Sequence, residues 1–306
     1  MRILFITSTR IGDAVLSTAL LDHLLRQHPG ARITIACGPA AVEVFARMPG
    51  RDATISVTKR RWSLHWPLLW AQVAPRWWDL VVDLRGSAMA WMVPARRRAV
   101  MRGGRRAGHR MGHIAETLGL TAADIAPVAW FDAADAARGA ALLPGAGPLL
   151  ALGPTANWDR KIWPAERFVA VARALTAPDG PLPGARIAVM GGPGDAERAL
   201  AAPVLAGLPG SVDLVGRLSL PEAAAVLAGA SLYLGNDSGL MHLAAAAGAP
   251  TLGLFGMSPA NEYAPFGPHA AAVVADGPPG HAPMEALPVD RVIAAAERLL
   301  GAPVPA

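Results

Sequence analysis

The stretch Asp237, Ser238 and Gly239, with His242 three residues further on, combines residue types that bind anions. It follows a short apolar run and precedes an alanine-rich segment, so a helix is expected to begin at Ser238 and Gly239. Free backbone N–H groups and the helix dipole favour an anion at such a point. Gly239 has no side chain to block a ligand, and Ser238 and His242 share one helical face. Ordinary helix capping by Asp237 is the alternative.

A lysine and a threonine follow a different apolar run, in the stretch LGPTANWDRKIWPAERF of residues 152–168. The chain has only two lysines, Lys59 and Lys161, and its other cations are arginines. A lysine retained in this background suggests a compact positive charge for a phosphate, and Thr155 can donate a hydrogen bond. The alternative is a surface lysine in a loop. The pattern favours a phosphate site that contains Lys161 and Thr155.

Three acidic residues complete the candidate chemistry. Asp13 follows a glycine in STRIGDAV, where it either caps a helix or accepts a proton from an attacking hydroxyl. Asp195 and Glu197 follow the glycine turn of VMGGPGDAERAL, where they either stabilise a first helical turn or bind ribose hydroxyls. That turn matches neither G-x-G-x-x-G nor G-x-x-x-x-G-K-[ST], so no cofactor is predicted.

The residues that bind metals do not form a recognisable pattern in the sequence. The eight histidines form no H-E-x-x-H motif, and there is no D-x-D triplet to hold a metal–diphosphate complex. The single cysteine, Cys37, excludes an intramolecular disulfide and a multi-cysteine zinc site. We therefore predict no metal site.

Short apolar runs alternate with helix-like segments along the whole chain. This alternation predicts parallel sheets with helices on both faces, an α/β fold. The expected helices include residues 14–27, 166–175, 221–227 and 289–301. The expected strands lie within residues 2–7, 32–37, 79–85, 148–154, 186–192, 212–216, 231–236 and 250–256.

The length of 306 residues suits two domains. The stretch ALLPGAGP, residues 141–148, is the best candidate linker, and a new strand follows it. We therefore expect two Rossmann-like, doubly wound halves, 1–146 and 147–306. Ligands of such sheets bind beyond the carboxyl ends of the strands, which is where every candidate motif lies.

Composition narrows the class of protein. Hydrophobic residues make up 53% of the chain and charged residues 17%, which allows a sizeable core. No apolar run is long enough to span a membrane, and the N-terminal run is too short for a signal peptide. These features predict a soluble cytoplasmic protein. The net charge of +5 suggests an anionic partner.

Two segments of the first half are unusual in composition. An arginine cluster is either a solvated face or a site for acceptor phosphates and carboxylates; nucleic acid is disfavoured because no reading module is evident. The stretch 59–78 holds five of the nine tryptophans, and Trp62, Trp66 and Trp70 recur every four residues. A packed helix is favoured there, and peripheral contact with a membrane is the alternative. The arginine cluster mentioned first comprises Arg96, Arg97, Arg98, Arg102, Arg105, Arg106 and Arg110.

Together these motifs resemble the bacterial lipopolysaccharide heptosyltransferases, glycosyltransferase family 9. The resemblance covers nearly the whole chain, in the expected order. It is carried by IGD (11–13), DLRG (83–86), HIAE (113–116), K-x-W-P (161–164), NDSGLMHLAAAAG (236–248) and LFG (254–256).

The resemblance implies the GT-B architecture, two Rossmann-like domains facing across a cleft, with an N-terminal acceptor domain and a C-terminal nucleotide-sugar domain. It implies metal-free, inverting transfer of a heptose from ADP-heptose to the acidic inner core of lipopolysaccharide. Asp13 would be the general base. The donor would be held by Thr155, Lys161, Asp195, Glu197, Asp237, Ser238, Gly239 and His242. The acceptor would be bound by Arg10, Arg85, Arg105, Arg110 and His113.

One loop departs from the family pattern, and other functions stay open at this point. The run GMSPANEYAPFGP, residues 256–268, replaces the more usual GPTDP-like run after the last strand, a departure that bears on the identity of the sugar or acceptor. A related transferase with another nucleotide sugar or a protein acceptor is the nearest alternative. A sugar-nucleotide epimerase of similar fold and a non-catalytic nucleotide-binding protein are the others.

Overall fold

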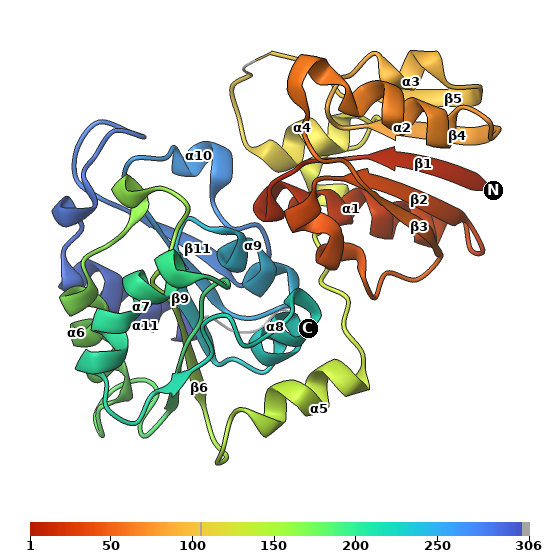
Figure 1. Ribbon diagram of the computed structural model, residues 1–306. Helices are drawn as coiled ribbons and strands as arrows, with labels where there is room; N and C mark the ends of the chain where they lie inside the picture. The colour runs from red at the N-terminus through yellow and green to blue at the C-terminus, as the bar shows by residue number, and fades with distance from the viewer. Residues whose placement is uncertain (105, 302–306) are drawn as a thin grey trace. The chain divides into compact units, whose positions relative to one another are not determined.

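The computed structural model describes residues 1–104 and 106–301, and it divides into two compact units at Trp130 and Phe131. Each unit is a parallel sheet with helices on both faces, as the sequence predicts (Figure 1). Within the described residues, no helix is both long enough and apolar enough to cross a bilayer.

The first unit, Met1–Trp130, contains a five-stranded sheet in the order β3-β2-β1-β4-β5. All of its strand pairs are parallel. The central strand β1 is almost entirely buried, because its apolar residues meet helices on both faces of the sheet. The strands are β1 (Arg2–Ile6), β2 (Arg32–Cys37), β3 (Arg51–Ser56), β4 (Trp78–Asp83) and β5 (Ala95–Val100).

Helices α2 and α3 cover one face of this sheet, and α1, η1 and α4 belong to the other. Leu69 and Val73 of α2 pack in one apolar cluster with Leu4 and Val81 of the strands. On the other side, α1 contacts both η1 and α4. The elements are α1 (Ile11–Gln27), η1 (Pro39–Phe45), η2 (Arg61–Ser63), α2 (His65–Val73), α3 (Met89–Met92), α4 (Arg110–Glu116) and η3 (Ala122–Asp124).

The helix expected in the tryptophan-rich stretch is present, but the expectation that its tryptophans are packed is wrong for two of the three. Helix α2 begins at His65, and it turns His65, Leu69 and Val73 toward the sheet. Trp62 precedes the helix, and both Trp62 and Trp70 are exposed. The four-residue spacing that buries His65, Leu69 and Val73 leaves Trp70 on the outer surface of the helix, and Trp62 lies outside the helix.

The second unit contains a six-stranded parallel sheet in the order β11-β10-β9-β6-β7-β8. Helices α6, α7 and α11 pack on one face around Trp163 and Phe168, which are fully buried. The strands are β6 (Leu149–Gly153), β7 (Arg186–Val189), β8 (Val212–Asp213), β9 (Leu232–Asn236), β10 (Thr251–Phe255) and β11 (Ala270–Val274). The helices are α5 (Ala133–Ala141), η4 (Asp159–Lys161), α6 (Ala165–Thr176), α7 (Asp195–Gly207), α8 (Leu220–Ala228), α9 (Gly239–Ala246), α10 (Ala260–Tyr263), η5 (Met284–Ala286) and α11 (Val289–Gly301).

The division between the units lies earlier in the chain than the expected position after residue 146. Helix α5, which precedes the predicted linker, packs on α8 of the second unit. Gly139 makes this close packing possible, because a Cβ atom there would lie 2.6 Å from Cγ2 of Val226. The Arg138 guanidinium also lies 3.9 Å from the Glu222 carboxylate. Helix α5 therefore belongs with the second unit, and the chain passes between units before it.

Candidate functional site

The predicted donor residues lie on three loops that follow adjacent strands of the second sheet. Strand β6 is flanked by β9 on one side and β7 on the other, so the chain order reverses at β6. The carboxyl ends of strands at such a switch point form the usual ligand site of an open α/β sheet. The loop after β6 carries Thr155 and Lys161, and the loop after β7 leads to Asp195 and Glu197. The loop after β9 carries Asp237 and Ser238 and leads to Gly239, the first residue of α9.

Lys161 and Asp237 form an ion pair between two of these loops. Lys161 Nζ lies 2.5 Å from Asp237 Oδ2, and the two side chains are only 21% and 7% exposed. A carboxylate in this position holds the ammonium at the carboxyl edge of the sheet. The Asp237 carboxylate thus pairs with the lysine, and the N-cap position of the helix that follows is occupied by Ser238.

Asn236, which the sequence analysis did not select as a site residue, connects the same loops. Its side chain is fully buried at the end of β9. Asn236 Oδ1 accepts a hydrogen bond from Trp163 N at 3.1 Å, and Nδ2 donates to Pro154 O at 2.8 Å. The amide thus fixes both ends of the loop that contains Thr155 and Lys161. Its place within the motif NDSG was the available signal, but the two partners are visible only in the fold.

Helix α9 begins next to the ion pair. Ser238 is its N-cap residue, but the Ser238 side chain makes no capping hydrogen bond to the backbone of the helix. The first N–H groups of α9 are therefore open to a ligand of negative charge. His242 lies in the second turn and is buried. Gly248, with φ of +87°, follows the end of the helix, as the sequence suggests.

Tyr233 of strand β9 is a second residue of this region that no local sequence pattern indicates. Its ring lies along the sheet over two glycines; a Cβ atom would be 2.0 Å from Tyr233 Oη at Gly153 and 2.4 Å at Gly235. Burial raises the pKa of the Tyr233 hydroxyl, the Glu197 carboxylate raises it further, and the Ser238 hydroxyl opposes the shift. The phenol therefore stays neutral and lies between the loops that carry Glu197 and Ser238.

Thr155 and Glu197 meet at the glycine turn after β7. Thr155 is buried, and a Cβ atom on Gly191 would lie 3.3 Å from both Thr155 Cγ2 and Glu197 Oε2. Glu197 Oε2 accepts a hydrogen bond of 3.0 Å from Gly192 N, so this carboxylate oxygen holds the turn itself. Asp195 is exposed at the first position of α7. Of the two predicted ribose partners, Asp195 is the one with an exposed side chain.

Asp13 lies at the corresponding edge of the first sheet, in the loop and helix that follow the central strand β1. Helix α1 begins at Ile11 with Arg10 as N-cap, so Asp13 is in the first turn rather than at the cap. Ser8 Oγ donates to Asp13 Oδ2 at 3.3 Å, and Arg110 Nε lies 3.5 Å from Asp13 Oδ1. Arg110, which we expected to bind an acceptor, is thus the ion-pair partner of the candidate base.

Strand β4 ends beside β1 with Asp83, which is fully buried. It accepts hydrogen bonds from Arg85 N at 2.8 Å, from Ser87 N at 2.9 Å and from Ser87 Oγ at 2.5 Å. Burial raises the pKa of the Asp83 carboxyl, and these hydrogen bonds oppose the shift. Arg85 itself is exposed, and its guanidinium lies 5.2 Å from the centre of the Trp66 ring. Asp83 therefore shapes the loop that presents Arg85.

The other predicted acceptor residues are dispersed. Arg10 is exposed at the start of α1, and Arg105 lies outside the described residues. His113 Nε2 is 3.0 Å from Ala107 O, which ties α4 to the preceding loop. Arg106 bonds to Glu116, and this hydrogen bond is the main cause of the lowered pKa of the Glu116 carboxyl. Part of the arginine cluster is thus used within the first unit.

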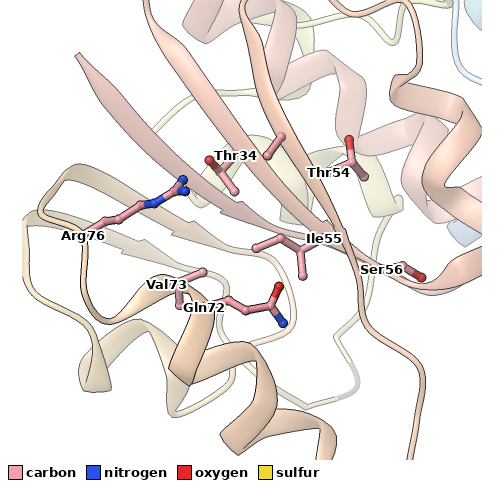
Figure 2. A pocket seen from close by; sticks show the side chains of 8 residues that line it. Thr34, Thr54, Ile55, Ser56, Gln72, Val73 and Arg76 are labelled. Atoms are coloured by element: carbon pink, nitrogen blue, oxygen red, sulfur yellow. The ribbon is translucent and has the colours of Figure 1, made fainter.

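A cavity of about 410 Å³ lies between α2 and the edge of the first sheet (Figure 2). Arg76 and Gln72 face it from one side, and Thr34 and Thr54 from the other. None of the predicted site residues is among its lining residues. The side chains described by the structure form no cluster of three or more His, Cys, Asp or Glu residues that could hold a metal ion.

A family model and a curated relative identify the family of this chain. The family model described as glycosyltransferase family 9 (heptosyltransferase) matches residues 112–285. Lipopolysaccharide heptosyltransferase 1 of Pseudomonas aeruginosa is 30% identical over 294 residues, which cover 84% of this chain and 79% of that protein.

Solved structures with the same fold cover nearly the whole chain. A glycosyltransferase family 9 protein from Veillonella parvula is 22% identical with a TM-score of 0.80, and the match covers 98% of this chain and 97% of that one. ADP-heptose LPS heptosyltransferase II of E. coli is 20% identical with a TM-score of 0.76 and 98% coverage of both chains. E. coli heptosyltransferase WaaC, solved with ADP, is 20% identical with a TM-score of 0.74, and the match covers 98% of this chain and all of that one.

The two parallel-sheet domains and these structural neighbours show the GT-B fold, and the family model and the curated relative show that the chain is a glycosyltransferase. The chain belongs to glycosyltransferase family 9, the heptosyltransferases.

Proposed function

We propose that this enzyme transfers a heptose from ADP-heptose to an acidic inner-core acceptor of lipopolysaccharide, with inversion and without a metal ion. Family membership and the curated relative, a lipopolysaccharide heptosyltransferase, support the substrate class. The observation that carries the proposal is the Lys161–Asp237 ion pair at the N-terminus of α9, which joins two loops of the switch point.

The second unit binds the donor in this proposal. Lys161 and Thr155 contact the diphosphate, and the first N–H groups of α9, at Ser238 and Gly239, donate hydrogen bonds to its other oxygens. Asp237 holds the lysine, and His242 supports the first turns of the helix from its buried side. Asp195 binds the ribose hydroxyls, with Glu197 shaping the turn between them.

Charge at the departing diphosphate is the main demand of the reaction, because the bond to the anomeric carbon breaks as ADP leaves. A fixed ammonium and oriented backbone N–H groups stabilise that charge in the way a divalent cation does in other transferases. This is the physical basis for proposing that transfer proceeds without a metal.

Asp13, in the first unit, is the proposed general base. The acceptor hydroxyl attacks the anomeric carbon from the side opposite the diphosphate, its proton passes to the Asp13 carboxylate, and the configuration inverts. Ser8 and Arg110 hold the two carboxylate oxygens. The first unit is accordingly the acceptor domain, and its exposed arginines, among them Arg10 and Arg85, suit an acidic acceptor. Arg105 and His113 complete the proposed acceptor set.

A donor and acceptor screen tests the proposal. The purified enzyme is incubated with ADP-heptose, UDP-sugars or GDP-sugars and an inner-core lipopolysaccharide acceptor, in the presence of a chelator. We expect transfer from ADP-heptose alone, unaffected by the chelator, with an inverted anomeric signal by NMR. Transfer from a different nucleotide sugar would show that ADP-heptose is not the donor. Loss of activity in chelator would show that the reaction needs a metal ion.

A further inference from the structure

Helix α2 exposes an apolar face to solvent. Its inner side, with His65, Leu69 and Val73, is buried against the sheet. Its outer side is also apolar: Leu68 and Trp70 are exposed, as are Pro67 and Ala71. A helix on the surface of a globular protein normally carries polar and charged residues on its outer side, so this face is unusual.

The neighbouring elements extend the same apolar surface. Trp62 is 84% exposed just before α2, and Trp91 is 68% exposed on α3. Helix α3 contacts α2, and the two are fastened by a hydrogen bond of 2.8 Å from Trp70 Nε1 to Met92 O (Figure 1). We call this surface the tryptophan face; it comprises the exposed side chains of Trp62, Leu64, Leu68, Trp70, Trp91 and Met92.

Positive charge lies beside the tryptophan face. Lys59, Arg60 and Arg61 are exposed immediately before Trp62, and Arg96 is exposed on the edge strand β5, on the same face of the strand as Arg98. The segment 57–115 contains twelve lysines and arginines but only two acidic residues. Those two acids are engaged elsewhere, since Asp79 accepts a hydrogen bond from Arg2 N and Asp83 is buried.

Arginine and tryptophan are also paired directly at this surface. The Arg98 guanidinium lies 5.8 Å from the centre of the Trp91 ring and donates to the carbonyls of Ala90 and Val93. This arrangement fixes the short helix α3 and keeps Trp91 outward. Aromatic rings with an apolar body and a polar edge, flanked by cations, suit the headgroup region of a membrane.

We propose that the tryptophan face binds the surface of a bilayer that contains anionic lipids. Trp62, Trp70 and Trp91 enter the headgroup region, Leu64 and Leu68 reach the acyl boundary, and the adjacent lysine and arginines contact lipid phosphates. A second copy of the chain is a poorer occupant, because two such faces would bring like charges together. The tryptophan face shares no residue with the proposed donor site, so the two proposals can fail independently.

Vesicle flotation tests this proposal with the full chain. We expect the protein to float with vesicles of phosphatidylcholine and phosphatidylglycerol, to remain unbound with phosphatidylcholine alone, and to dissociate as NaCl is raised. The double variant Trp62→Ser/Trp91→Ser should weaken binding by about tenfold or more, because binding strength depends on buried apolar area. Arg60→Gln and Arg61→Gln should each weaken it about fivefold.

The matched control is Trp158→Ser, because Trp158 is an exposed tryptophan of the second unit with the Arg160 guanidinium 5.9 Å from its ring. This variant should bind vesicles as the wild type does. Failure of the wild type to bind anionic vesicles, or unchanged binding by the double variant, would overturn the proposal. Wild-type dimers in light scattering that become monomers in the double variant, without vesicle binding, would identify a second copy as the occupant instead.

Discussion

Lys161 and Asp237 pair at 2.5 Å although 76 residues separate them in the chain. The pair closes the space between the loops after β6 and β9, beside the first turn of α9. It gives the switch point of the second sheet a fixed positive charge at the place where the helix dipole is also positive. Lys161 and Asp237 can each be replaced separately to test this arrangement.

Replacing Lys161 by alanine should raise the dissociation constant for ADP by about 10- to 100-fold, the size of one charge-assisted hydrogen bond. Isothermal titration calorimetry measures this directly. Asp237→Asn should lower the free energy of unfolding by about 1–3 kcal/mol, because a largely buried ammonium loses its counter-charge. Lys59→Ala, which removes the only other lysine, is the control and should bind ADP normally. Unchanged ADP affinity in Lys161→Ala would count against the phosphate role.

Asp13→Asn should reduce kcat by about 10²- to 10⁴-fold, the usual contribution of a general base, and leave ADP affinity unchanged. Steady-state kinetics and calorimetry on the same preparation separate the two effects. Arg110→Gln should lower kcat less, because Ser8 still holds one Asp13 oxygen, and Arg110→Lys should restore part of the loss. Near-normal turnover by Asp13→Asn would remove the base assignment.

Asn236→Ala should destabilise the protein by about 2–5 kcal/mol, because it leaves Trp163 N and Pro154 O buried without partners. The same change should weaken ADP binding, since both ends of the Lys161 loop are released. Urea unfolding and calorimetry measure the two effects. Asn157→Ala, an exposed asparagine of the same loop, is the matched control. A stable Asn236→Ala variant would show that the loop is held by other contacts.

Gly153→Ala should destabilise the protein by about 1–3 kcal/mol, because the added methyl group would overlap Tyr233 Oη and force the ring to move. A displaced ring would also disturb Ser238, so ADP affinity should fall. The control is Gly112→Ala in α4, where a Cβ atom meets nothing within 4 Å. Equal stability of the two variants by denaturant unfolding would contradict the packing described for Tyr233.

Cys37 should make stability fall at alkaline pH. Burial raises the pKa of its thiol from 9.0 to about 12, so the folded state holds the proton more tightly than the unfolded state. Its stabilising effect is therefore complete below pH 9 and is lost as the pH rises toward 12, by about 1.4 kcal/mol for the first pH unit. Urea unfolding at pH 8 and pH 10 should show a larger loss in the wild type than in Cys37→Ala. Parallel losses would show that the thiol is not the cause.

The sequence alone was sufficient for the central strands and insufficient for three at the edges. All eight expected strands are present; seven are central, where parallel strands are short, continuous apolar runs, and the eighth, β8, lies at an edge. The strands that were missed are β3, β5 and β11, and each lies at the edge of its sheet. An edge strand has one exposed side and tolerates charge, so the ARRRAV sequence of β5 resembles a basic loop.

Site residues that are neighbours in sequence could be predicted, and residues whose role depends on contacts between different loops or strands could not. Asp237, Ser238 and Gly239 follow one strand, so their neighbours in sequence are also their neighbours in space. The roles of Asn236 and Tyr233 depend on contacts across neighbouring strands that no local pattern records. Arg110 was assigned to an acceptor because it is a cation in a basic cluster, whereas the fold pairs it with Asp13.

The packing of α5 on α8 has a consequence for recombining this enzyme with its relatives. Because Gly139 and Val226 interlock, the helix must travel with the second unit when halves of two homologues are exchanged. A chimaera joined at residue 146 would separate α5 from the partner against which its surface was selected, and would leave the α8 surface mismatched. A junction at residues 130–131 keeps that contact within one parent.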